Sequence, residues 1–96
     1  MRLVPLFLLA FAATPAFGQA PVYSATPTAA PAQQRLVVRD SVWRCSASQC
    51  VSGNSLTRHA LVCASLARSV GPLSRFAVNG TEFSAEQLAS CNRSAR

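Results

Sequence analysis

The sequence is poor in the side chains on which enzymes most often depend. It has no lysine, one histidine (His59) and three acidic residues, Asp40, Glu82 and Glu86. His59 and Asp40 could contribute to a hydrolytic triad, but no serine lies in the glycine pattern of a nucleophile elbow. A glycosidase would need a carboxylate pair, yet Glu82 and Glu86 suit a hairpin and a helix start, where a negative charge is favourable. We therefore expect no enzymatic activity and no catalytic residues.

The chain also lacks a Cys-x-x-Cys motif, which argues against a thioredoxin-like redox site. Its closest cysteines, Cys45 and Cys50, are separated by four residues. A Cys₃His set for tetrahedral zinc could be drawn from Cys45, Cys50, His59 and Cys63, but their spacing matches no common zinc module. We expect no cofactor and no bound metal, and we assign the cysteines a structural role.

Because lysine is absent, all nine basic residues are arginines, and the net charge is +6. A small cationic protein attracts acidic partners. If several arginines share one face, they would form an anion-binding patch for lipopolysaccharide, acidic polysaccharide or nucleic acid; the alternative is an ordinary solvated surface. No aromatic residues interleave with them in the manner that stacks bases, so we expect no specific nucleic-acid partner. The candidate anion-binding residues are Arg35, Arg39, Arg44, Arg58, Arg68 and Arg75.

An apolar run over residues 3–13 carries no charge and follows Arg2. Its length suits a signal peptide and is too short for a membrane-spanning helix. A small-x-small pattern, which signal peptidase recognises, then ends at Gly18. We predict that residues 1–18 are a signal peptide cleaved after Gly18, with cleavage after Ala20 as the alternative. The mature chain would then be periplasmic or secreted, with no membrane span.

Residues 19–34 contain no charge and three prolines, and only Val22 and Tyr23 are large and apolar. Such a segment buries too little surface to offset its ordering entropy, and its prolines favour extended conformers. We predict a Pro/Ala-rich disordered tether; the alternative is an extended segment anchored on a partner by Tyr23. The folded domain would then comprise residues 35–96.

A domain of this size is marginally stable on its core alone. An even number of cysteines in a short exported chain is typical of a disulfide framework. Four cysteines allow three pairings. Cys45 and Cys50 would face each other across a tight hairpin, whereas Cys63 and Cys91 would each project from the apolar face of a helix. We predict the disulfides Cys45–Cys50 and Cys63–Cys91.

The remaining pattern predicts a small α+β domain with short antiparallel strands and two helices. Residues 36–38 and 42–43 are apolar and β-branched or aromatic, which favours two strands on either side of a bend at residues 39–41. We expect Trp43 in the core. A third short strand would continue from Cys50 to Val51 and stop at the Gly-Asn pair that follows.

A first helix is predicted over residues 56–70, capped by Ser55 or Thr57 and ended by Gly71. Arg68 lies in its last turn. Its broad apolar face suggests packing against both a sheet and the second helix. The residues of this face are Ala60, Cys63, Ala64, Leu66, Ala67 and Val70.

A hairpin is predicted over residues 76–83, because Asn79-Gly80 supplies the two positive φ values of a type I′ turn. Ser84 and Gln87 then form a capping box that opens a second helix at Ala85. Leu88 and Cys91 share a face of this helix at helical spacing.

From Val38 onwards the chain resembles a group of small, uncharacterised exported proteins of Gram-negative bacteria. The resemblance implies a periplasmic or secreted protein, with no assigned activity and no catalytic residues. It is carried by Val42-Trp43-Arg44-Cys45, Cys50, Val62-Cys63-Ala64, Leu66-Ala67-Arg68, Gly71, the hairpin at Phe76, and Cys91-Asn92.

Taken together, these features favour a non-enzymatic binding or accessory protein of the cell envelope or periplasm. Its partner would be a protein or an anionic envelope component. The alternative is a cationic secreted effector that binds anionic surfaces. An apolar surface patch would favour a protein partner, whereas salt-dependent binding to a polyanion would favour the effector.

Overall fold

A computed structural model describes residues 21–96 of the chain. The predicted signal peptide over residues 1–18 lies outside this range. Within it, no helix is long and apolar enough to cross a bilayer. The strands are β1 (Tyr23–Pro27), β2 (Arg35–Val38), β3 (Ser41–Cys45), β4 (Cys50–Ser52), β5 (Leu73–Val78) and β6 (Thr81–Glu82), and the helices are α1 (His59–Val70) and α2 (Ala85–Asn92).

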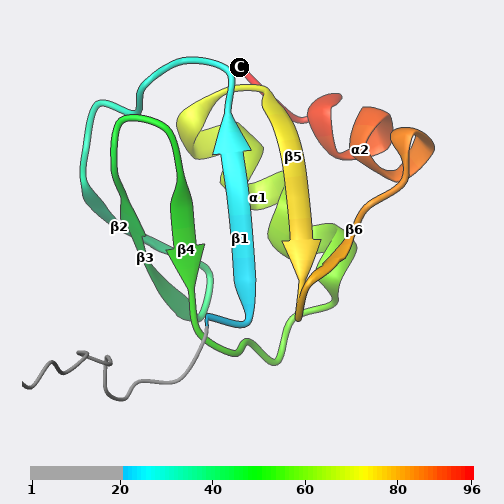
Figure 1. Cartoon of the computed structure of the whole chain (residues 1–96), viewed down its shortest axis with the longest axis horizontal. Helices are drawn as coiled ribbons and strands as arrows, with labels where there is room; N and C mark the ends of the chain where they lie inside the picture. The colour runs from blue at the N-terminus through cyan, green and yellow to red at the C-terminus, as the bar shows by residue number, and fades with distance from the viewer. Residues whose placement is uncertain (1–20) are drawn as a thin grey trace, which may run out of the picture.

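The strands form one antiparallel sheet in the order β2-β3-β4-β1-β5-β6. Figure 1 shows α1 behind β1 and β5, with α2 beside β5. Along β3, buried and exposed side chains alternate, because successive residues of a strand point to opposite faces. The helices cover one face of the sheet, and no helix of the part of the chain that the structure describes covers the other face. The predicted α+β class, with short antiparallel strands and two helices, is confirmed.

The most N-terminal strand, β1, lies in the middle of the sheet between β4 and β5 (Figure 1). We predicted a disordered tether over residues 19–34 and a domain that begins at Arg35. This prediction is wrong for residues 23–27, which form β1. Tyr23, Ala25 and Pro27 are buried, and the two residues between them are only half-buried. Pro27 lies where the register with β5 shifts, and such irregular positions tolerate the missing N–H of proline. The folded unit thus includes β1.

The first predicted strand pair is confirmed, since β2 and β3 are joined by the two-residue turn Arg39-Asp40. Arg39 adopts a positive φ of 55°, as the first central residue of a type II′ turn does. Val38 pairs with Ser41 across this turn. The turn thereby fixes the register of the whole hairpin.

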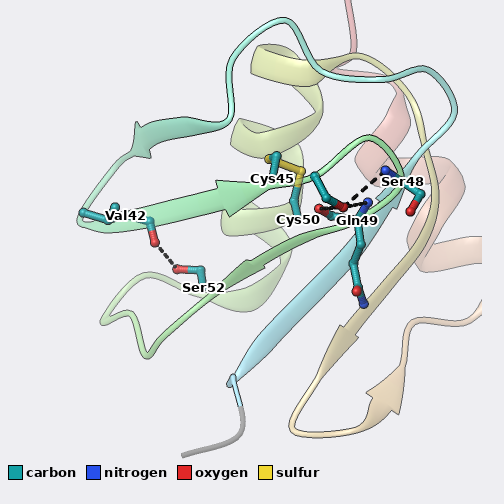
Figure 2. The surroundings of a disulfide bond; sticks show 7 residues. Val42, Cys45, Ser48, Gln49, Cys50 and Ser52 are labelled. Carbon is teal, nitrogen blue, oxygen red and sulfur yellow. Dashed lines mark hydrogen bonds between the residues drawn. A yellow bond between two sulfur atoms is a disulfide. The ribbon is translucent and has the colours of Figure 1, made fainter. Parts of the chain in front are cut away.

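Strands β3 and β4 are joined by the predicted four-residue turn and by the predicted Cys45–Cys50 disulfide (Figure 2). The two Cα atoms lie 4.0 Å apart. The Ser46 N–H donates to the Gln49 carbonyl, and the Ser46 hydroxyl oxygen accepts from the Gln49 N–H at 3.2 Å. At the other end of the hairpin, the Ser52 hydroxyl donates to the Val42 carbonyl at 3.0 Å.

Helix α1 begins at His59, three residues later than predicted. Neither Ser55 nor Thr57 caps it: its N-cap is Arg58, with no side-chain hydrogen bond at the cap. The reason is Asp40, whose carboxylate accepts hydrogen bonds from this segment and holds it as a loop. The helix ends at Gly71 as predicted. Val62, Cys63, Leu66 and Ala67 form its buried face, whereas Ala60, which we placed on that face, is exposed.

The second hairpin and the second helix follow the prediction closely. Asn79 and Gly80 have φ values of 51° and 84°, and Val78 pairs with Thr81 across them. Ser84 and Gln87 form the capping box that opens α2. The N-terminus of α2 is therefore fixed directly after β6.

The second disulfide joins Cys63 of α1 to Cys91 of α2, as predicted. Both cysteines are buried. Beneath α1, the side chains of Tyr23, Trp43 and Phe76 lie in mutual contact and are almost completely buried, which confirms the core position of Trp43. Burial, and secondarily the negative charge of Asp40, raises the pKa of Tyr23.

Removal of the helix–helix disulfide should destabilise the fold more than removal of the hairpin disulfide. The Cys63–Cys91 bond joins residues 28 positions apart in the sequence, and the Cys45–Cys50 bond joins residues 5 positions apart. A longer crosslinked loop removes more chain entropy from the unfolded state. We expect the free energy of unfolding to fall by about 3.5 kcal/mol in a Cys63→Ala/Cys91→Ala variant and by about 2 kcal/mol in Cys45→Ala/Cys50→Ala. Urea denaturation of both variants measures this; equal losses, or the reverse order, would contradict it.

Truncation of the central aromatic of β1 should also be costly. Tyr23→Ala removes a ring that is 0% exposed, and we expect it to lower the free energy of unfolding by about 3–5 kcal/mol. The matched control is Ser24→Ala on the opposite side of the same strand, with an expected change within about 0.5 kcal/mol. A Tyr23→Ala midpoint equal to that of the control would show that β1 is not part of the folded unit.

Candidate binding surface

The side of the sheet that the helices leave uncovered is the main candidate surface, and we call it the open face. Its residues alternate with the core residues along each strand. Val37 is 69% exposed and Val42 is 42% exposed, and the two lie directly opposite each other on β2 and β3. The open face consists of Ser24, Thr26, Arg35, Val37, Val42, Arg44, Val51, Arg75, Ala77 and Glu82.

Two arginines lie directly opposite each other on the open face. Arg35 of β2 pairs with Arg44 of β3, and both are exposed. The Cys45 N–H donates to the Gln34 carbonyl at 2.7 Å, so the neighbouring Arg35–Arg44 pair occupies the non-hydrogen-bonded position of the ladder, where side chains come closest. Like charges in this arrangement are destabilising. A bound anionic group would relieve this repulsion.

The other candidate arginines do not join this pair. Arg75 also lies on the open face, but it forms an ion pair with Glu82 and donates hydrogen bonds to its carboxylate. The hydrogen bonding from Arg75 lowers the pKa of Glu82. Arg39 donates to the Ser65 hydroxyl of α1 at 2.6 Å. Arg58 and Arg68 lie at opposite ends of α1, about 15 Å apart at the rise of an α-helix. Of the six candidate residues, the structure therefore brings only Arg35 and Arg44 together.

Asp40 organises the loop that precedes α1. Its carboxylate accepts hydrogen bonds from the Ser55 hydroxyl at 2.5 Å, the Leu56 N–H at 2.9 Å and the Thr57 hydroxyl at 3.3 Å. These bonds, the one from Ser55 first, lower the pKa of Asp40. As a result Leu56 is held at the surface, 95% exposed. Asp40 is thus engaged in a structural role.

The residues considered for catalysis or metal binding do not converge in residues 21–96. His59 is exposed at the start of α1, with its ring in a T-shaped contact with the ring of Tyr23, and no hydrogen bond joins it to a serine or a carboxylate there. Cys45, Cys50 and Cys63 are all in disulfides, so they offer no thiolate to zinc. Glu82 is paired with Arg75, and Glu86 lies in the first turn of α2.

The surface of residues 21–96 carries shallow hollows at the open face, at the outer edge of β2 and between the two helices. One of about 510 Å³ is lined by Val22, Val42, Val51 and Arg44 among others. A second, of about 650 Å³, follows the outer edge of β2. A third, of about 490 Å³, lies between α1 and α2, where Leu61 and Phe83 contribute apolar surface. None is lined by a cluster of chemically reactive side chains.

These features define a small disulfide-stapled α+β domain with a half-covered sheet. Residues 7–93 match a family of unknown function, DUF8200. The match covers most of the chain, β1 included, and the chain therefore belongs to this family. No curated protein and no solved structure matches the chain significantly.

The valine pair on the open face was not predicted from the sequence. Residues 36–38 were predicted only as an apolar strand, with no assignment of which side chains face the core. The signal was the short turn: once Arg39-Asp40 is taken as a two-residue loop, Val37 faces Val42 and Arg35 faces Arg44. Strand alternation then places these two pairs on the face opposite Trp43.

The Asp40 loop should open at low pH. Because the pKa of Asp40 is lowered in the folded state, its contribution to stability is present above the unfolded-state pKa of about 3.9 and is lost as the pH falls through the lower, folded-state value. We expect the difference in unfolding free energy between the native protein and Asp40→Asn to shrink as the pH falls below about 4. Denaturation at several pH values measures this. A difference that stays constant down to low pH would exclude a role of the ionised Asp40 carboxylate in holding this loop. Ser48→Ala, in an exposed turn, is the control.

Proposed function

We propose that this protein is a non-enzymatic, exported binding or accessory protein that recognises a protein partner through its open face. The observation that carries this proposal is the exposed Val37–Val42 pair on a sheet face that no helix of the described chain covers. Apolar side chains gathered on an otherwise polar surface are typical of interaction sites. The neighbouring hollow lined by Val22, Val42 and Val51 extends this apolar area.

Export is supported by the two disulfides together with the N-terminal sequence. Disulfides persist in oxidising compartments such as the periplasm and the extracellular space. All four cysteines are paired. Combined with the signal-peptide pattern of residues 1–18, this favours a periplasmic or secreted protein.

A binding role is favoured over catalysis because the polar residues already have structural partners. Asp40 holds the loop before α1, and Glu82 is paired with Arg75. His59 is exposed, and its ring makes only a T-shaped contact with the ring of Tyr23. A catalytic site would require a nucleophile, a base and an orienting group within hydrogen-bond reach of one another.

The second candidate function is a cationic effector that binds anionic surfaces. It is favoured by one observation: Arg35 and Arg44 lie next to each other, and neither forms an ion pair within residues 21–96. The separation of the other four candidate arginines argues against this function, because a protein binds a polyanion by contacting several of its phosphates or carboxylates at once. We therefore favour the protein partner.

A photo-crosslinking residue introduced in place of Val42 tests the proposal. We expect it to form an adduct with one defined envelope protein, and excess unlabelled protein should suppress that adduct. The same residue in place of Arg68, which is exposed on α1, is the matched control and should form none. Equal adducts from both positions, or none from Val42, would contradict a protein partner at the open face. Salt-sensitive adducts with lipopolysaccharide alone would support the effector instead.

A further inference from the structure

The outer edge of β2 carries free backbone hydrogen-bonding groups. The Cys45 N–H donates to the Gln34 carbonyl, and hydrogen-bonded pairs alternate with non-bonded pairs along an antiparallel ladder. In the observed register, Leu36 and Val38 therefore direct their N–H and C=O groups towards β3. Arg35 and Val37 direct theirs away from the sheet. This strand is the last in the sheet order, so no strand of residues 21–96 pairs with that edge.

The residues with outward backbone groups also have their side chains on the open face. Arg35 lies next to Arg44, and Val37 lies next to Val42. Along the edge, a basic pair is thus followed two residues later by an apolar pair. An extended segment beside β2 would present its own side chains with the same period of two.

The surface beside β2 has room for such a segment. The hollow of about 650 Å³ runs along the edge and is lined by Gln33, Arg35, Leu36, Val37 and Ser69. Ser69, near the end of α1, forms its far wall. The segment 28–34, which connects β1 to β2, crosses the top of the sheet and then runs down to the start of β2 (Figure 1), where its Gln33 lines the hollow.

We propose that the partner adds an extended segment to β2, with an acidic side chain against Arg35 and Arg44 and an apolar side chain against Val37 and Val42. This rests on the proposed function and specifies the partner's chemistry. Strand addition satisfies the free backbone groups, and the side chains at alternate positions give the specificity. The acidic group neutralises the repulsion between the two arginines.

Charge also selects against a second copy of this chain as the occupant. In an antiparallel β2–β2 pair with matching faces, Arg35 would oppose Val37 of the other copy, and four arginines would gather on one face. Charged side chains on an edge strand are a known protection against such self-pairing. An acidic partner turns the same residues into an attraction.

A designed peptide provides the probe. An acetylated peptide of about eight residues, in which glutamate and valine take turns at every second position and threonine fills the positions between them, matches the pattern of the edge. We expect it to bind the oxidised full-length protein and to slow hydrogen exchange at the Arg35 and Val37 amides. A peptide with glutamine in place of glutamate should bind about tenfold more weakly or worse. Equal binding of both peptides, or exchange protection elsewhere only, would overturn the proposal.

Two variants separate strand addition from general attraction. Val37→Pro removes an outward N–H and no hydrogen bond to β3, so the sheet should still form, while peptide binding should be lost. Arg35→Glu should weaken binding by about tenfold or more, whereas Arg68→Glu on α1 is the control with the same change in net charge and should bind normally. Thermal melts establish that each variant is folded. Normal binding by folded Val37→Pro would overturn strand addition.

The crosslinking experiment at Val42 distinguishes this failure from failure of the proposed function. If adducts from Val42 persist in a Val37→Pro background, the open face binds its partner without strand addition, and only the present proposal is overturned. Dimerisation of the protein without peptide, abolished by Val37→Pro, would assign the edge to a second copy and would also overturn it. Binding of a polyanion such as heparin with the same affinity as the peptide would do so as well.

Discussion

The structure depends on the pairing of β1 with strands on both sides. β2, β3 and β4 form one unit, whose strand β4 pairs with β1, and β5 and β6 form a second unit, whose strand β5 pairs with β1. Within residues 21–96, no strand of one unit pairs with a strand of the other. The Tyr23 side chain contacts Trp43 from the first unit and Phe76 from the second. One short strand therefore joins the sheet and supplies the centre of the core.

The disulfides supplement this arrangement at the places where packing is weakest. A chain of this size buries only a modest fraction of its surface, and α2 has a single fully buried residue, Cys91. Its crosslink to Cys63 holds α2 against α1 at the far side of the sheet. The Cys45–Cys50 bond closes a strand pair in which β4 is only three residues long. Crosslinks and the central strand together allow one sheet face to remain uncovered.

Local signals in the sequence were sufficient for most elements. The Asn79-Gly80 turn, the Ser84–Gln87 capping box and the Gly71 helix end each follow from backbone chemistry within a few residues. Both disulfides followed from which elements carry the cysteines. β1 was missed because its partners lie far away in sequence and its composition, one proline and three small residues after Tyr23, resembles a linker. The start of α1 was missed because it is set by Asp40, a residue of an earlier turn.

The candidate surface was predictable only in part. The arginines were recognised, but their arrangement depends on the register of the β2–β3 hairpin, and it proved to be one adjacent pair and four separate residues. The valines of the open face were visible as strand residues, yet their exposure depends on where the helices pack. Composition reveals which groups are present, whereas topology decides which of them meet.

The position of β1 also has a consequence for how the polypeptide matures. Synthesis releases the N-terminal end of a chain first, so Tyr23–Pro27 becomes available long before Leu73–Val78. The sheet cannot be completed until β5 has been synthesised, because β5 is one of the two partners of β1. Until then β2, β3 and β4 belong to an incomplete sheet. Such non-local pairing makes folding slow. During this interval the partly folded chain exposes the apolar side chains of its unfinished core, which makes it a target for proteases and chaperones.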